Sequence, residues 1–230
     1  MLLSMLQDST EVLADAISEE KTLSIYKLIM DGGIGGQIII ALLVVLLTVA
    51  LYIYFERFFT IRAASKTDSN FMNQIRDNVS HGKLDAAKML CTQTNSPASR
   101  LVEKGISRIG KPLEDINTAI ENAGRLEIYK LEKNVPVLAT IAGAAPMIGF
   151  LGTVIGMIVA IHEIANAGGQ IDIKMLSDGL YTAMTTTVAG LIVGIISYIQ
   201  YNHLVVRTNK VVYEMEAKSV EFLDLLNEPI

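Results

Sequence analysis

Residues 135–161 read VPVLATIAGAAPMIGFLGTVIGMIVAI, a stretch without a single Asp, Glu, Lys or Arg. Two further stretches, residues 34–55 and 179–202, also lack charged side chains, although such residues make up 19% of the whole chain. Runs of about 20 predominantly apolar residues are long enough to cross the hydrocarbon core of a bilayer as helices. The sequence therefore predicts an all-α integral membrane protein with three transmembrane helices.

The distribution of basic residues predicts how the chain is oriented. Residues 56–134 hold thirteen of the nineteen Lys and Arg, whereas residues 1–33 hold only two. Because Lys and Arg concentrate in cytoplasmic segments, we expect a multi-pass topology with the N-terminus outside and the C-terminus inside. The predicted segments are an outer N-terminal amphipathic helix with a glycine hinge (1–33), a first span (34–55), a cytoplasmic helical loop (56–134), a second span (135–161), an outer, periplasmic loop (162–178), a third span (179–202) and a cytoplasmic helical tail (203–230).

Helical patterns also dominate outside the predicted spans. Residues 68–93 indicate two short helices, and Ser96-Pro97 fits the N-cap and first turn of the next one. A Gly-Lys-Pro interruption at 110–112 predicts the start of a further helix. From Leu113 that helix is expected to continue unbroken into the second span, with Pro136 causing only a kink. The third span is also expected to extend inward, so that these helices form a cytoplasmic bundle.

The second and third spans carry many small residues, whereas the first is uniformly apolar and is expected to be peripheral. Small residues let helix backbones approach closely, and both spans contain the GxxxG spacing. We therefore expect the second and third spans to form a packed inner pair. The glycines assigned to this contact are Gly149, Gly152, Gly156, Gly190 and Gly194.

Threonines lie at matching depth in these two spans. Thr153 is eight residues from the outer end of the second span, and Thr187 is eight residues from the outer end of the third, so each is about 12 Å inward at 1.5 Å per residue. A Thr in a membrane helix often bonds its own i−4 carbonyl and does nothing more. Four Thr within six residues, opposite another in a Gly-rich helix, favour a polar lining instead. The predicted pore-lining residues are Thr153, Thr187, Thr182 and Thr186.

Several chemical functions find no support in the residues. The lone Cys91 cannot form an internal disulfide, and the sequence shows no cluster of Cys and His for zinc. His162-Glu163 resembles the start of an HExxH metalloprotease motif, but Asn166 stands where the second His is needed. We expect no enzyme activity, catalytic residue, metal or cofactor. The three spans contain no ionisable acid or base of the kind that marks proton pathways, so an acid for proton transport would have to come from another chain.

The segments Gly149-Phe-Leu-Gly-Thr-Val-Ile-Gly-Met157 and Leu180-Tyr-Thr-Ala-Met-Thr-Thr-Thr-Val-Ala-Gly-Leu191, with Tyr201-Asn202, closely resemble the ExbB/TolQ branch of the MotA/TolQ/ExbB proton-channel family. The resemblance covers essentially the whole chain. It implies a homo-pentamer in the inner membrane, with the second and third spans around a pore. Thr153 and Thr187 match the family's pore-facing Thr positions.

The resemblance also implies partners. The pore would hold an ExbD/TolR-like single-span protein with an essential intramembrane Asp, and proton flow would energise TonB-dependent outer-membrane transport through a TonB-like protein. A TolQ-like or gliding-type stator, or a non-conducting membrane scaffold, remains an alternative. Two positions differ from the family pattern, since Thr182 replaces a Glu and Ile196 replaces a Pro. The first difference argues against a proton-binding acid on this subunit but leaves the partner's Asp untouched.

Overall fold

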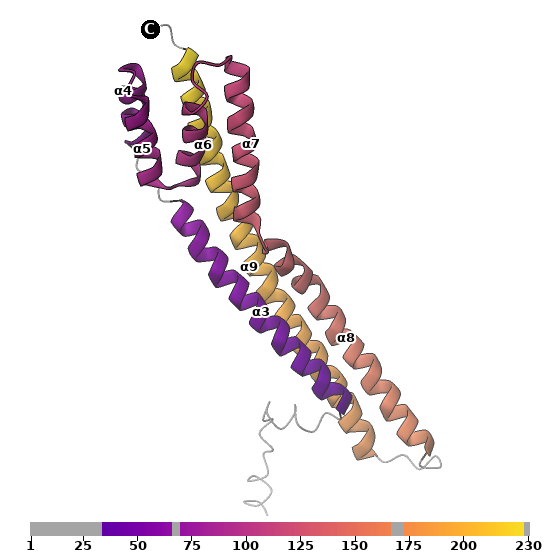
Figure 1. The fold of residues 1–230 in the computed structure, drawn as a ribbon. Helices are drawn as coiled ribbons and strands as arrows, with labels where there is room; N and C mark the ends of the chain where they lie inside the picture. Colours follow the sequence, from indigo (N-terminus) through magenta and orange to yellow (C-terminus); the bar gives the residue numbers. More distant parts are fainter. Residues whose placement is uncertain (1–33, 66–69, 167–172, 228–230) are drawn as a thin grey trace, which may run out of the picture. The chain divides into compact units, whose positions relative to one another are not determined.

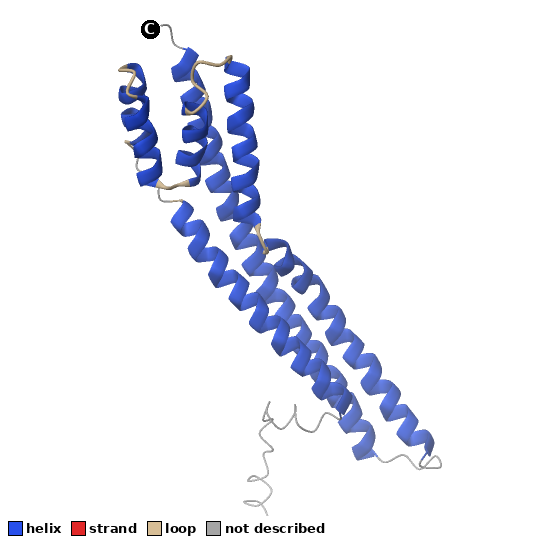
Figure 2. Ribbon diagram, in the orientation of Figure 1, coloured by secondary structure: helices blue, strands red, loops and turns tan. Residues whose placement is uncertain are grey.

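The computed structural model describes residues 34–65, 70–166 and 173–227, which form α-helices, with short turns between the helices of residues 71–166 (Figures 1 and 2). Three helices are long: α3 (Ile34–Ala64), α8 (Val135–Asn166) and α9 (Ile173–Asn227). Four shorter helices lie between α3 and α8 in the sequence, namely α4 (Phe71–Ser80), α5 (Leu84–Thr94), α6 (Pro97–Ile106) and α7 (Leu113–Glu132). The N-terminal amphipathic helix predicted for residues 1–33 lies outside the described residues.

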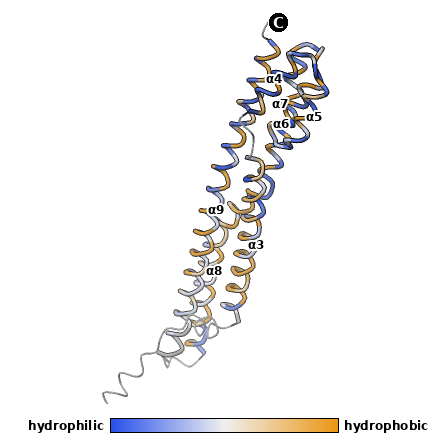
Figure 3. The backbone as a smooth tube through the Cα atoms, turned by 90° about the vertical axis from the view of Figure 1, so that its left-hand side faces the viewer, coloured by the Kyte–Doolittle hydropathy of each residue, from blue (hydrophilic) through white to orange (hydrophobic). Residues whose placement is uncertain are grey.

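Three helical stretches, within 35–64, 113–166 and 179–227, are long and apolar enough to cross a membrane. Figure 3 shows the apolar residues concentrated in α3, α8 and the first part of α9. Many large apolar side chains point outward from these helices, as expected where lipid is the solvent, among them Ile38, Val44, Phe150, Ile158, Ile192 and Ile199. The chain is a helical membrane protein. The third span extends beyond its apolar part in one unbroken helix of 55 residues, as predicted.

The chain divides into two compact units. One comprises Met1–Ala41 and Gly149–Val188, and within it the start of α3 packs with the end of α8 and the start of α9. The other comprises Leu42–Ile148 and Ala189–Ile230, and it contains α4 to α7 with the remaining parts of the three long helices.

Helices α4 to α7 pack in sequence order, α4 on α5, α5 on α6 and α6 on α7. Helix α6 begins as predicted, because Ser96 and Ser99 form a capping box and Pro97 occupies the first turn. Its apolar face is buried, and Gly105 allows the ring of Phe222 on α9 to lie directly against its backbone. Lys218 of α9 lies over the ring of Phe71 on α4, with its Nζ 5.8 Å from the ring centre.

An ion-pair network joins α6 to α7. Arg100 Nη2 donates to Glu127 Oε2 at 2.6 Å, and Lys130 Nζ donates to Glu127 Oε1 at 2.7 Å. Glu127 is only 5% exposed, so its carboxylate needs these partners to remain charged. Burial opposes its ionisation, but the two hydrogen bonds outweigh this effect and hold the pKa of Glu127 below its ordinary value.

The expectation of one unbroken helix from Leu113 into the membrane is wrong. Helix α7 ends at Glu132 and α8 begins at Val135, with Lys133 and Asn134 forming a turn between them. Asn134 adopts the left-handed conformation with φ of 64°, which Asn tolerates better than most residues. Pro136 supplies the physical reason, because its ring would clash with the carbonyl of Glu132 and it has no N–H to donate there. In the first turn of a new helix the missing N–H costs nothing.

Candidate functional site

Glycines bring α8 and α9 into close contact within the first unit. A methyl group added to Gly156 would lie 3.1 Å from the Cβ of Ala183 and 3.3 Å from the carbonyl oxygen of Gly179. One added to Gly152 would lie 2.7 Å from the Cβ of Thr186. Such small residues allow the backbone of one membrane helix to touch the other directly. The polar atoms of the two helices are therefore within hydrogen-bonding reach.

Thr153 of α8 and Thr187 of α9 are hydrogen-bonded to each other through their hydroxyls. Thr153 Oγ1 also lies 3.1 Å from the carbonyl oxygen of Ala183, and Thr187 Oγ1 lies 3.2 Å from that of Gly149. The proximity predicted from the shared depth of the two threonines is confirmed. Each hydroxyl is bonded across the helix pair rather than to its own i−4 carbonyl.

The other two predicted pore residues point elsewhere in this subunit. Thr186 is completely buried, and its Oγ1 lies 2.8 Å from the carbonyl oxygen of Ala183 and 3.3 Å from that of Gly149. Thr182 lies against α3, since a methyl group added to Gly36 would be 2.7 Å from its Cγ2. Thr153 and Thr187 thus form a pair, which we call the Thr153–Thr187 pair, and their role in lining a pore stays a prediction.

The Thr153–Thr187 pair can change its hydrogen-bonding pattern without moving its oxygens. Three contacts involve the two hydroxyls, but each hydroxyl carries one hydrogen, so two hydrogens serve three contacts. At most two of the three contacts are therefore hydrogen bonds at any moment, and donation to a ligand would replace one of these two. A hydroxyl pair of this kind can donate to a carboxylate or accept from a carboxylic acid. It cannot itself carry a proton as a charge at neutral pH.

The structure adds a feature that the sequence reasoning did not anticipate, because the start of α3 contacts both helices of the pair. Gly35 lies near Ile155 of α8, Gly36 lies against Thr182 of α9, and Ile39 is close to Gly152. The signal was present in the sequence as two glycines at the start of an otherwise uniformly apolar helix. Both glycines belong to the first turn of α3, directly after the hinge predicted within residues 1–33.

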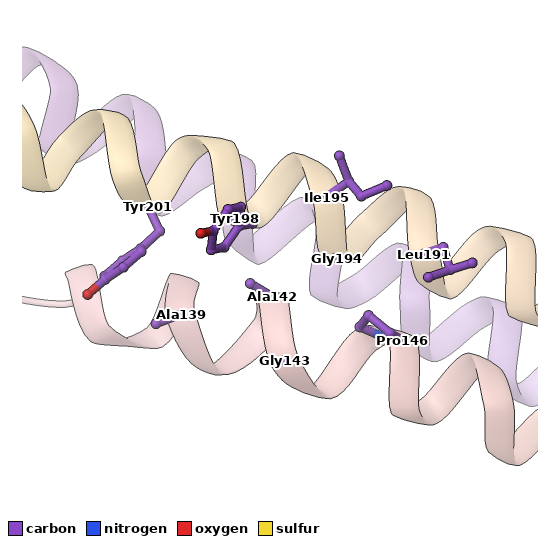
Figure 4. Close-up of a pocket in the computed structure, with 9 residues that line it drawn as sticks. All are labelled: Ala139, Ala142, Gly143, Pro146, Leu191, Gly194, Ile195, Tyr198 and Tyr201. Atoms are coloured by element: carbon purple, nitrogen blue, oxygen red, sulfur yellow. The ribbon is translucent and has the colours of Figure 1, made fainter.

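In the second unit, α8 and α9 enclose an apolar groove with a volume of about 470 Å³ (Figure 4). Pro146 lies inside α8 and has no N–H for the carbonyl of Ala142, and both groups face Gly194 of α9. A methyl group on Gly194 would lie 2.6 Å from the ring of Pro146. Gly190 is buried as well. The groove is lined by Ala139, Ala142, Gly143, Pro146, Leu191, Gly194, Ile195, Tyr198 and Tyr201.

The residues weighed for other chemistry occupy ordinary structural positions. Cys91 is completely buried, and burial, with a smaller contribution from Glu103, raises the pKa of its thiol to about 12. His162 Nε2 lies 3.0 Å from the amide nitrogen of Asn166, one helical turn away. Within the described part of the chain, no group of three or more His, Cys, Asp or Glu is placed to hold a metal ion.

Comparison with known proteins places this site in a family context. The family model described as the MotA/TolQ/ExbB proton channel family matches residues 93–217, which include the Thr153–Thr187 pair. A Tol-Pal system protein TolQ of Haemophilus influenzae is 32% identical over 135 residues, covering 59% of this chain and 54% of that protein. A biopolymer transport protein ExbB of Aquifex aeolicus is 36% identical over 103 residues, covering 44% of this chain and 69% of that protein.

The length of the similarity differs between relatives. The TolQ of Pseudomonas aeruginosa is 23% identical over 218 residues, covering 90% of this chain and 94% of that protein. In contrast, the matches to the H. influenzae TolQ and to a putative ExbB homologue of Methanothermobacter thermautotrophicus span only 54% and 47% of those proteins, about half their length.

Proposed function

Since this chain belongs to the MotA/TolQ/ExbB proton channel family, we propose that it is the stator subunit of a proton-driven motor. It assembles as a homo-pentamer in the inner membrane, with its N-terminus outside and α4 to α7 in the cytoplasm. Helices α8 and α9 of the five copies surround a pore. An ExbD/TolR-like single-span partner occupies the pore and supplies an intramembrane Asp.

The Thr153–Thr187 pair is the observation that carries this proposal. It places two hydroxyls at one level of two helices whose apolar stretches contain no charge. Five copies would present five such pairs around a partner helix. An ionised Asp is stabilised by a hydroxyl that donates to it, whereas the neutral acid crosses an apolar sector at much lower cost. Protonation and movement of the partner are thereby coupled.

The motor we favour is the ExbB-type, which energises TonB-dependent outer-membrane transport. Relatives named ExbB and relatives named TolQ both match this chain, so a TolQ-like or gliding-type stator is the second candidate. A non-conducting scaffold, in which the glycine faces only pack helices, is the third. We propose no enzyme activity, because the three spans contain no Asp, Glu, His, Lys or Cys.

The identity of the co-purifying partner separates these candidates. Native mass spectrometry of the protein from its own membrane should find a pentamer that holds a small single-span protein with an intramembrane Asp. The soluble domain of that protein would distinguish the ExbB-type from the TolQ-type motor. A homo-oligomer without an acidic partner would contradict the stator assignment and favour the scaffold.

The function of the hydroxyl pair is tested with the double variant Thr153→Val/Thr187→Val. In proteoliposomes containing the complex, we expect proton flux to fall by at least about tenfold, the effect of losing about 1.4 kcal/mol of stabilisation. Thr185→Val is the matched control, because the Thr185 hydroxyl is bonded within α9 to the carbonyl of Tyr181 at 2.9 Å. Both variants should still assemble. Unchanged flux in the double variant would refute the role of the pair.

A further inference from the structure

A second polar cluster lies in the other unit and has no part in the proposed pore. Tyr54 and Phe58 are one helical turn apart on α3, and His203 and Arg207 are one turn apart on α9. Tyr54 Oη lies 2.8 Å from His203 Nδ1, and Arg207 Nε lies 2.8 Å from His203 Nε2. The carbon of the Arg207 guanidinium also lies 5.1 Å from the centre of the Phe58 ring. Through His203 these contacts tie α3 to α9.

The chemistry of the partners determines the protonation state of His203. An arginine side chain has only donors, so Arg207 Nε–H must donate and His203 Nε2 must accept. An imidazole that accepts at Nε2 is neutral and carries its hydrogen at Nδ1. Nδ1–H therefore donates to Tyr54 Oη. The full chain of hydrogen bonds forms only in this neutral state and this tautomer.

Protonation of His203 is incompatible with this arrangement. A proton added to the lone pair of Nε2 would turn an acceptor into a donor that faces the Arg207 N–H, and it would place two positive charges side by side. The bond between His203 and Arg207 must then break, whereas the bond to Tyr54 can persist. Histidine is the side chain whose charge ordinarily changes between pH 5 and 8.

In the described residues, no carboxylate is hydrogen-bonded to His203 or paired with Arg207 to offset this effect. Among the described residues, the side chains that contact the His203 ring are Tyr54 and Phe58 from α3 and Arg207 from α9. The acid closest along α3, Glu56, is paired with Arg57, whose Nη1 in turn donates to the carbonyl of Lys130 on α7 at 3.0 Å. Within the described part of the chain, no carboxylate therefore pairs with Arg207 to hold it beside a protonated His203.

We propose that His203 is a proton-binding site that controls the attachment of α3 to α9. In the neutral state it holds Arg207 over Phe58 and bonds Tyr54. On binding a proton it releases Arg207 from the Phe58 ring, so that one of the contacts joining α3 to α9 at this level is lost. The site lies just beyond the apolar part of α9, on the cytoplasmic side in the orientation proposed above. The proposal does not require a pore or a partner acid, so it stands or falls separately from the stator assignment.

The tautomer is tested by nitrogen NMR on the full chain in lipid nanodiscs, with ¹⁵N-labelled histidine. The chain has only three histidines, so His81→Gln and His162→Gln leave the signals of His203 alone. At pH 8 we expect the Nδ1–H tautomer to dominate. Arg207→Leu removes the donor and should increase the share of the Nε2–H tautomer. A dominant Nε2–H tautomer in the parent protein would overturn the proposal.

The mechanical consequence is tested by spin labels on Arg62→Cys and Lys210→Cys, both at exposed positions. Cys91 is buried and will not compete for the label. When the pH is lowered from 8 to 5.5, the distribution of distances between the two spin labels should broaden and shift to longer values as His203 becomes protonated. In His203→Gln, whose amide oxygen accepts from Arg207 without titrating, it should stay constant. The proposal would be overturned by any of three results: an equal response in both proteins, no response in the parent, or a His203 that stays neutral at pH 5.5.

Discussion

Replacing Gly152 with Ala should destabilise the contact between α8 and α9. The added methyl group would lie 2.7 Å from the Cβ of Thr186 and 3.2 Å from Cδ1 of Ile39. Carbon atoms in contact prefer about 3.5 to 4.0 Å, and a Cβ cannot rotate away, so the helices must separate by about 1 Å. The Thr186 and Thr187 hydroxyls, now 3.3 and 3.2 Å from the carbonyl oxygen of Gly149, would then lose that acceptor.

The expected magnitude combines these two effects. Overpacking costs about 1 to 3 kcal/mol. Two interhelical hydrogen bonds in a membrane contribute about 0.6 kcal/mol each. Ala gains about 1 kcal/mol over Gly in helix propensity. Gly152→Ala should therefore lower the free energy of unfolding by about 1 to 3 kcal/mol.

The measurement is reversible unfolding in mixed micelles with SDS, followed by circular dichroism. Gly143→Ala is the matched control, because no side chain or other helix lies within 4 Å of a methyl group added there. It keeps the gain in helix propensity without the clash, so it should be neutral or stabilising. If the two variants differ by less than about 0.5 kcal/mol, the ordinary range for surface substitutions, the reasoning about close packing is refuted.

Three further predictions concern the other unit. Because the pKa of Glu127 is lower in the folded protein, its stabilisation is complete above the ordinary value of 4.5 and is lost as pH falls through the folded pKa. The difference in unfolding free energy between the parent and Glu127→Gln should stay constant from about pH 7 to 5 and shrink towards about pH 3. A difference that grows on acidification would contradict the lowered pKa of Glu127. Cys91 is buried and its pKa is raised from 9.0 to about 12, so at pH 8 it should react with a maleimide on the order of 1,000-fold more slowly than in the SDS-unfolded chain. Comparable rates would mean that the thiol is accessible. Asn134→Gly should unfold at nearly the same SDS concentration as the parent, whereas Asn134→Val should lower the free energy of unfolding by about 1 to 2 kcal/mol. Equal stability of the two variants would contradict the left-handed turn.

The sequence predicted those elements that depend on local patterns. Ser96-Pro97 specifies a helix start through its own hydroxyl and ring, without help from distant residues. The shared depth of Thr153 and Thr187 followed from counting residues at a constant rise per residue. The turn at Asn134 escaped this reasoning, because the apolar spacing continues on both sides of it. The sequence signal for the end of α7 was Pro136, which cannot donate a hydrogen bond to the preceding helical turn.

The sequence by itself determined that this chain is a helical membrane protein, because a charge is too costly in hydrocarbon to be scattered through a spanning helix. The tertiary structure decided which hydroxyls meet. Thr186 and Thr187 are neighbours in the sequence and differ little in depth, yet Thr186 is sealed inside the helix pair while Thr187 bonds Thr153. Residue spacing gives the height of a side chain along its helix. The direction that it faces depends on how the second helix rotates when the glycines of the first allow it to approach.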